Sequence, residues 1–186
     1  MILLALGVIL FAACHLTLAI PEANEAVRRG FGKLYGPGFG LVSLVPLVLI
    51  VLGWRMAPFD PLYEAPSWGR IATFALVLLA FLCLGIFLFR GSLRQKLRFP
   101  LAWGVVFWSL GHLCSNGDWA SVILFGGMLI YALAHLGLGS ANGIRPSPII
   151  RQGHDVISII MGVALYGVFA QLHPLLTGVP VVTLSL

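Results

Sequence analysis

Three histidines lie inside apolar stretches of this chain, and the residues before each of them follow one pattern. An aromatic residue stands four positions before each histidine and a glycine eight positions before: Gly7, Phe11, His15; Gly104, Trp108, His112; Gly127, Tyr131, His135. A spacing of four places the members of each trio on one helix face. An imidazole beside a flat ring and a glycine can admit a planar macrocycle, so the pattern favours axial ligation of a haem iron.

Helix packing is the alternative explanation of the trios. The chain has 22 glycines, and small residues let transmembrane helices approach each other without any cofactor. A titratable group inside lipid is costly and usually faces the protein interior, which keeps the ligand hypothesis open. His154 and His173 fall at the ends of apolar stretches, where we expect interfacial polar residues.

The composition is typical of a protein embedded in a lipid bilayer. Hydrophobic residues make up 60% of the 186 residues and charged residues 9%, with a mean hydropathy of +1.03. Soluble domains carry roughly a quarter charged residues. We therefore predict an all-α transmembrane helix bundle, with residues 1–186 forming one membrane domain. No P-loop, dinucleotide fingerprint, GxSxG or HExxH motif occurs, so no soluble-enzyme class is indicated and the catalytic residues stay unknown.

Six apolar runs are long enough to predict transmembrane helices: residues 2–20, 38–54, 71–89, 100–115, 119–137 and 156–173. Pro21 ends the first run, and we interpret that run as a mature helix because no basic region precedes it. Residues 56–68 are rich in proline, which predicts a loop. A turn at Asn116, Gly117 and Asp118 separates the fourth and fifth spans, and a short apolar tail follows the sixth.

The loop charges predict the orientation. Nine of the eleven Lys and Arg residues fall in the first, third and fifth loops. The positive-inside rule places these loops in the cytoplasm and both termini on the other side, the periplasm for a bacterial inner membrane. The net charge of +5 is explained in this way, so no nucleic-acid partner is expected. Arg94, Lys96 and Arg98 form a basic loop that we expect to face anionic lipid headgroups.

Four other residues have simple structural interpretations. Asp118 is the only acid between the fourth and fifth spans, and we expect it to cap the fifth helix, with a role in a site near His112 as the alternative. Cys14, Cys83 and Cys114 form no CxxC motif, so we interpret them as packing residues without a disulfide framework.

The stretch LRQKLRFPLAWGVVFWSLGHLCSNGDWASVILFGGMLIYA, residues 93–132, resembles the NnrU family. The resemblance rests on a basic residue two positions before Pro100 and on Gly104, Trp108, His112-Leu113, Asn116-Gly117-Asp118, Ser121 and Leu124-Phe125-Gly126. The opening LFAACHLTLAIP and the ending HPLLTGVPVV are also similar to the family, so the resemblance spans nearly the whole chain.

The resemblance implies a cofactor and a biological process. NnrU proteins are associated with denitrification and nitric oxide metabolism, and the related zeta-carotene isomerases are haem b proteins with histidine ligands. By similarity the ligands fall on His15 and His112, with Trp108 and Gly104 beside the haem. Two departures count against isomerase activity: Phe99 stands where the family often has histidine, and Ser109 stands where the isomerases have a cysteine.

The depths of the histidines in the membrane favour His15 and His135 as the pair. At a rise of 1.5 Å per residue, and in the predicted orientation, His15 lies about 6 Å to the cytoplasmic side of the centre of its helix. His112 lies about 6 Å to the opposite side of the centre of its own helix. His135 lies about 10 Å inward, which makes it the runner-up ligand.

The sequence supports three alternative hypotheses for the function of this chain. The first is a haem b protein of nitric oxide or denitrification metabolism, whether accessory protein, sensor or redox enzyme. The second is a haem-dependent cis–trans isomerase of a carotenoid-like polyene. The third is a cofactor-free membrane scaffold or transporter. The expected partners are membrane lipid and an apolar small molecule or nitric oxide.

Overall fold

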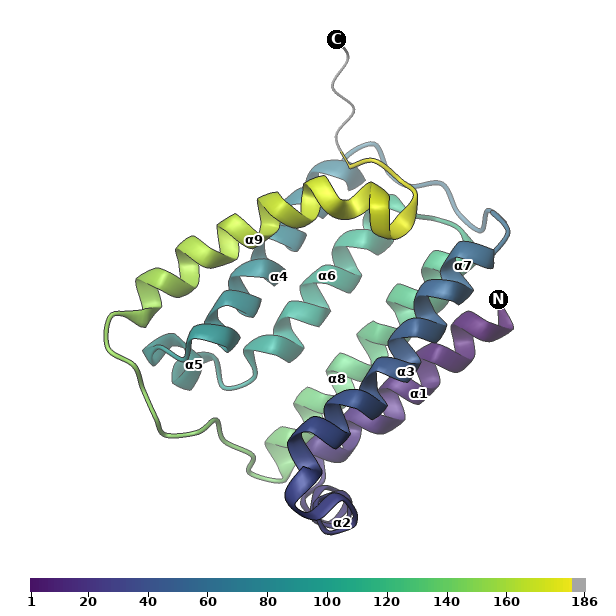
Figure 1. The fold of residues 1–186 in the computed structure, drawn as a ribbon. Coiled ribbons are helices and arrows are strands. Elements are labelled where there is room, and N and C mark those ends of the chain that lie inside the picture. Colours follow the sequence, from purple (N-terminus) through teal and green to yellow (C-terminus); the bar gives the residue numbers. More distant parts are fainter. Residues whose placement is uncertain (182–186) are drawn as a thin grey trace. The chain divides into compact units, whose positions relative to one another are not determined.

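The computed structural model describes residues 1–181, and they are helical apart from their connections (Figure 1). The chain divides into two compact units. Unit 1 comprises Met1–Glu64 and Asn116–Ile144; unit 2 comprises Ala65–Ser115 and Arg145–Leu186. Each unit is therefore built from two separate segments of the sequence. The prediction of one membrane domain over residues 1–186 stays a prediction.

Unit 1 is built from three long helices. Helix α1 (Ile2–Leu16) continues into a 3₁₀ turn at Thr17–Ala19, and the amphipathic helix α2 (Pro21–Phe31) leads through a second 3₁₀ turn to α3 (Tyr35–Met56). The third helix consists of α7 (Trp119–Ser121), a π-helical turn (Val122–Gly126) and α8 (Gly127–Ala141). Helix α1 packs against both α3 and α8.

Unit 2 is built around one central helix. Helix α4 (Gly69–Phe89) packs against α6 (Pro100–Ser115) and also against α9 (His154–Thr177). The short helix α5 (Ser92–Leu97) links α4 to α6. The carboxylate of Asp155 in α9 accepts hydrogen bonds from the Ser92 hydroxyl and from the Leu93 amide, the latter at 2.9 Å, and so caps the start of α5.

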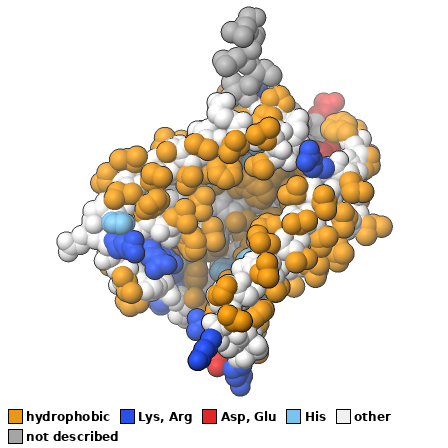
Figure 2. Space-filling view, viewed as in Figure 1, with side chains coloured by type: hydrophobic (Ala, Val, Ile, Leu, Met, Phe, Trp, Pro, Cys, Tyr) orange, Lys and Arg blue, Asp and Glu red, His pale blue; other side chains and the backbone are white. Residues whose placement is uncertain are grey.

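The structure confirms the all-α membrane class. Each predicted span coincides with a helix, and five helical segments of residues 1–181 are long and apolar enough to cross a membrane. Hydrophobic side chains cover most of the face seen in Figure 2, on both units. Helix α6, with 16 residues, is shorter than the roughly 20 that span a bilayer. The count of six spans and the orientation stay predictions.

The structure adds helices where the sequence predicted polar connections. Helix α2 begins with Pro21 as its first residue, and Arg28 and Arg29 lie in its last turn, where cations are favoured by the helix dipole. The Tyr35 hydroxyl donates to Asn24 at 2.7 Å, which ties α2 to the start of α3. Helix α9 extends to Thr177, beyond the predicted end at residue 173; of the apolar tail, residues 182–186 lie outside the described part.

Close backbone contact joins the helices of each unit. In unit 1 a Cβ atom added at Gly53 of α3 would collide with the backbone of Leu4 in α1, and one at Gly7 would lie 2.8 Å from the amide nitrogen of Ile50. In unit 2 a Cβ atom at Gly85 of α4 would collide with the carbonyl of Ser158 in α9. These contacts are closer than any side chain permits, so glycine sets the spacing of the helices.

The turn between α6 and α7 is held by the proline-rich segment. The Gly117 carbonyl accepts hydrogen bonds from the amides of Leu62 and Tyr63 at 2.7 and 2.9 Å, and the Trp119 amide donates to Asp60 at 2.9 Å. Asp118 accepts from the Ser121 amide at 3.0 Å, which confirms the predicted cap. These hydrogen bonds give a structural role to the residues of the turn, which carry part of the family resemblance.

We expect Gly53→Ala to destabilise unit 1, because the new methyl group would push α1 away from α3. The expected loss is about 1–3 kcal/mol in the free energy of unfolding, measured by denaturation of the purified protein in detergent. Gly40→Ala is the matched control in the same helix, since no atom lies within 4 Å of a Cβ placed there. Equal stability of the two variants would contradict the role of Gly53.

We expect Asp118→Ala to lower the free energy of unfolding by about 1 kcal/mol, because the Ser121 amide loses its acceptor. Asp118→Asn keeps a side-chain oxygen at the cap and should retain most of the stability. Thermal unfolding of the three proteins in one detergent measures the difference. An alanine variant as stable as the wild type would show that the cap contributes nothing.

Candidate functional site

His15 is held in unit 1 by the turn of helix before it. Its Nδ1 lies 3.0 Å from the carbonyl oxygen of Phe11, and its ring stacks on the Phe11 ring with centroids 4.0 Å apart. A carbonyl oxygen can only accept, so Nδ1 carries the proton. The neutral imidazole then presents Nε2 as a lone pair, which is the form that binds a metal.

Tyr131 lies between the two predicted histidines of unit 1. Its ring centroid is 6.3 Å from that of His15 and 5.9 Å from that of His135. Phe11 meets the Tyr131 ring edge-on at 5.4 Å, and Phe39 of α3 meets His15 at 5.6 Å. Unit 1 thus brings His15 and the runner-up His135 to one aromatic cluster, with contributions from α1, α3 and α8.

His112 has the same local arrangement in unit 2. Its Nδ1 donates to the Trp108 carbonyl at 2.8 Å, and the Trp108 ring lies 5.2 Å away. A second histidine, His173 of α9, lies beside it, with ring centroids 6.4 Å apart and planes within 14° of parallel. We expected His173 to be an interfacial polar residue, and its contact with His112 is not predicted from the sequence. The ending HPLLTGVPVV, which carries part of the resemblance, was the signal available.

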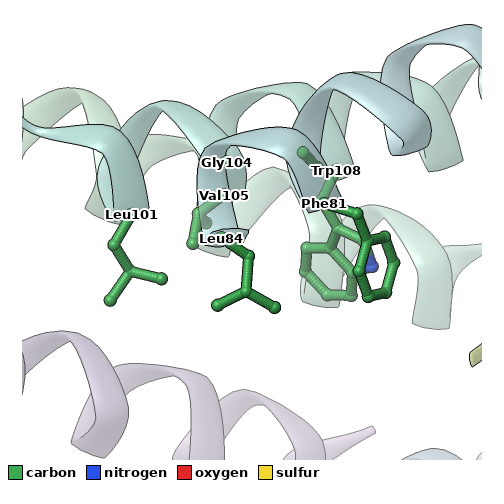
Figure 3. Close-up of a pocket in the computed structure, with 7 residues that line it drawn as sticks. Phe81, Leu84, Leu101, Gly104, Val105 and Trp108 are labelled. Atoms are coloured by element: carbon green, nitrogen blue, oxygen red, sulfur yellow. The ribbon is translucent and has the colours of Figure 1, made fainter. Parts of the chain in front are cut away.

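An apolar groove runs along unit 2 between α4 and α6 (Figure 3). Its volume is about 140 Å³, and it is lined by Ala80, Phe81, Leu84, Leu101, Gly104, Val105 and Trp108. Leu101, Val105 and Trp108 follow a helical spacing that reaches His112 one turn later, so the groove face of α6 continues to the imidazole. Two residues predicted to contact a cofactor, Gly104 and Trp108, therefore line one groove.

The glycines of the three trios face neighbouring helices. A Cβ atom at Gly104 would lie 3.1 Å from the Ala80 carbonyl, one at Gly127 would lie 2.5 Å from Val8, and Gly7 meets Ile50. Helix packing, the alternative explanation, accounts for these positions. The prediction that Gly104 contacts a cofactor stays a prediction, since Gly104 also lines the groove.

The basic residues predicted to form a loop in unit 2, Arg94, Lys96 and Arg98, lie in the last turn and at the end of helix α5. The guanidinium of Arg94 lies 5.1 Å from the ring centroid of Phe87, and that of Arg98 lies 4.9 Å from Phe99. Burial and the nearby charge of Arg90 lower the pKa of Arg94. His154 donates from Nδ1 to the Phe89 carbonyl at 2.8 Å and so holds the end of α4. The prediction that the loop faces lipid headgroups stays a prediction.

Two further observations bear on the cofactor. The three cysteines are free thiols. Across residues 1–181 no group of three or more His, Cys, Asp or Glu side chains lies close enough to hold a bare metal ion. The pair implied by the resemblance, His15 and His112, takes one residue from each unit, and this pairing stays a prediction.

Comparison with known proteins identifies the family. No curated protein and no solved structure matches the chain. The family model described as NnrU protein matches residues 3–181, which includes both units and every histidine discussed above. The chain is therefore an integral membrane protein that belongs to the NnrU family.

Proposed function

We propose that this chain is a haem b-binding protein of the bacterial inner membrane that serves nitric oxide or denitrification metabolism. The observation that carries the proposal is the arrangement of His112. Its Nδ1 is committed to the Trp108 carbonyl 2.8 Å away, and it follows Trp108, a residue of the groove, by one helical turn. An imidazole whose Nδ1 proton is fixed by a carbonyl presents Nε2 to iron, and this arrangement recurs among metal-ligating histidines.

The residues of the groove suit the rest of a haem. A porphyrin is a flat and largely apolar ring, and the groove offers the indole of Trp108, the ring of Phe81 and aliphatic side chains. The ring of Phe81 also packs against the rings of Tyr166 and Phe169 of α9, whose centroids lie 6.0 and 5.3 Å away. An apolar surround of this kind excludes water from a ligand and tunes its reduction potential.

His15 also fits the role that the resemblance implies for it. It has the same bond from Nδ1 to the carbonyl four residues earlier, at 3.0 Å. When bound, haem would supply a redox-active iron that can take nitric oxide as a ligand. The chain itself would bind and orient the macrocycle and keep water from it.

The absorption spectrum of the detergent-purified protein tests the proposal. We expect a Soret band, after haem supplementation if necessary, that His112→Ala removes or weakens. His154→Gln is the matched control in the same unit, because His154 also donates from Nδ1 to a carbonyl but lies at the opposite end of α9 from His173. Added imidazole should restore the band in folded His112→Ala by filling the vacated position.

Two results would favour the other functions. A folded wild-type protein that stays colourless with excess haem would contradict haem binding and leave a scaffold or transporter. A coloured protein that changes the cis–trans composition of a supplied polyene would favour the isomerase over a role in nitric oxide metabolism.

A further inference from the structure

A strongly basic junction forms in unit 2 where the end of α4, helix α5 and the start of α9 meet. Residues 90–98 and 145–151 contain no acid and supply the cations Arg90, Arg94, Lys96, Arg98, Arg145 and Arg151. Figure 2 shows cationic side chains gathered over α5 and bordered by hydrophobic ones. We propose that this junction binds one anionic phospholipid, whose phosphate lies between Arg90 and Arg94. Neither arginine belongs to the site proposed for haem.

Hydrogen bonds tie separate segments of the chain together at the basic junction. The Arg151 amide donates to the Arg90 carbonyl at 3.1 Å, which joins the segment before α9 to the end of α4. The side-chain amide of Gln95 donates to the Ser147 carbonyl, which joins α5 to the same segment. These bonds use backbone groups and an uncharged side chain. They therefore hold the cations in one place without neutralising any of them.

The protein supplies no anion to the two arginines. Asp155 is the only acid in unit 2, and its carboxylate accepts hydrogen bonds from the Ser92 hydroxyl and the Leu93 amide. Among residues 1–181 no carboxylate forms an ion pair with Arg90 or Arg94. Burial and the charge of Arg90 lower the pKa of Arg94, so the two cations repel each other. The positive-inside rule requires cations on one side of a membrane but not this crowding, which an anion between them would offset.

Both guanidinium groups lie where α4 ends. The Arg94 guanidinium is half-buried and lies 5.1 Å from the ring centroid of Phe87, in the last turn of α4. Arg90 is exposed and adopts a left-handed conformation with φ of 58°, which terminates the helix. In the predicted orientation this end of α4 reaches the cytoplasmic headgroups, where lipid phosphates lie. The planar fork of a guanidinium binds a phosphate through two parallel hydrogen bonds.

Exposed apolar side chains beside the arginines favour a lipid over a free anion. Ile149 and Ile150 come directly before Arg151 and are 63% and 48% exposed, and Leu88, two residues before Arg90, is 48% exposed. A soluble anion would leave these side chains uncovered. An acyl chain attached to the bound phosphate would cover them, and burial of apolar surface adds to the attraction between the charges.

Lipid binding to the full chain in detergent tests the proposal, by native mass spectrometry and thermal unfolding. The probes are phosphatidylglycerol and phosphatidylcholine with the same acyl chains. We expect one phosphatidylglycerol to bind saturably and to raise the unfolding temperature, and phosphatidylcholine to do neither. The double variant Arg90→Gln, Arg94→Gln should bind phosphatidylglycerol roughly 10- to 30-fold more weakly, the effect of losing two cations at a membrane surface.

Arg70→Gln is the matched control at the opposite end of α4. It removes the same charge from the same unit, and the Arg70 guanidinium also lies over a phenylalanine ring, 5.7 Å from the centroid of Phe74. We expect this variant to bind phosphatidylglycerol as the wild type does. An equal loss of affinity in Arg70→Gln and in the double variant would assign the effect to net charge and overturn the proposal.

Arg90→Gln alone separates lipid binding from folding. Without lipid we expect this variant to be at least as stable as the wild type, because Arg94 is relieved of a like charge. With phosphatidylglycerol it should gain less stability than the wild type. A variant that is less stable without lipid but keeps the full response to phosphatidylglycerol would show that Arg90 has only a structural role.

Two results on the wild type would overturn the proposal without any variant. Equal binding of the two lipids would show that the site does not recognise an anion. Equal stabilisation by glycerol 3-phosphate or by inorganic phosphate would show that the junction takes a free anion and that Ile149, Ile150 and Leu88 contribute nothing.

Discussion

Contact between helix backbones is the interaction on which each unit depends. Lipid is as apolar as the side chains that face it, so helices in a membrane gain little from hydrophobic burial and associate through close packing. Gly53 brings α3 onto α1, and Gly85 brings α9 onto α4. The second contact has a consequence for chemistry, because α4 also packs against α6. With α4 between them, α6 and α9 are held so that His112 and His173 meet.

The absence of water inside a membrane also determines how the imidazole nitrogens are hydrogen-bonded. A polar nitrogen that leaves water must find a partner within the protein, and a backbone carbonyl is the nearest acceptor. His15 and His112 use the carbonyl four residues earlier, while His173 uses one beyond the end of its helix. One hydrogen bond thereby satisfies a donor and fixes a tautomer. The bond that satisfies this donor also leaves Nε2 available as a ligand, so it has a structural value even where no metal binds.

The sequence predicted the helices well and their contacts poorly, for a physical reason. An apolar run of about 20 residues indicates a transmembrane helix by itself. Which face of that helix meets a neighbour depends on the partner, and an apolar surround leaves no polar stripe to reveal it. In the sequence, the glycines of the three trios were equally compatible with contact to a macrocycle or to a neighbouring helix. The structure shows helix contacts, because Ala80, Val8 and Ile50 lie against these glycines. The bonds from Gly117 to the proline-rich segment were hidden because they join distant parts of the chain. Asp118 was predictable because a cap acts within three residues.

The contact between His112 and His173 was only partly predictable from the sequence. The arithmetic of helix rise that separated His15 from His112 applies equally to His173, which lies late in a helix of the same direction as α6. Whether the two rings meet depends on which faces of α6 and α9 point toward each other, and no periodicity in an apolar helix reveals those faces. The packing of α4 against both helices decides it and brings the two imidazoles together within unit 2.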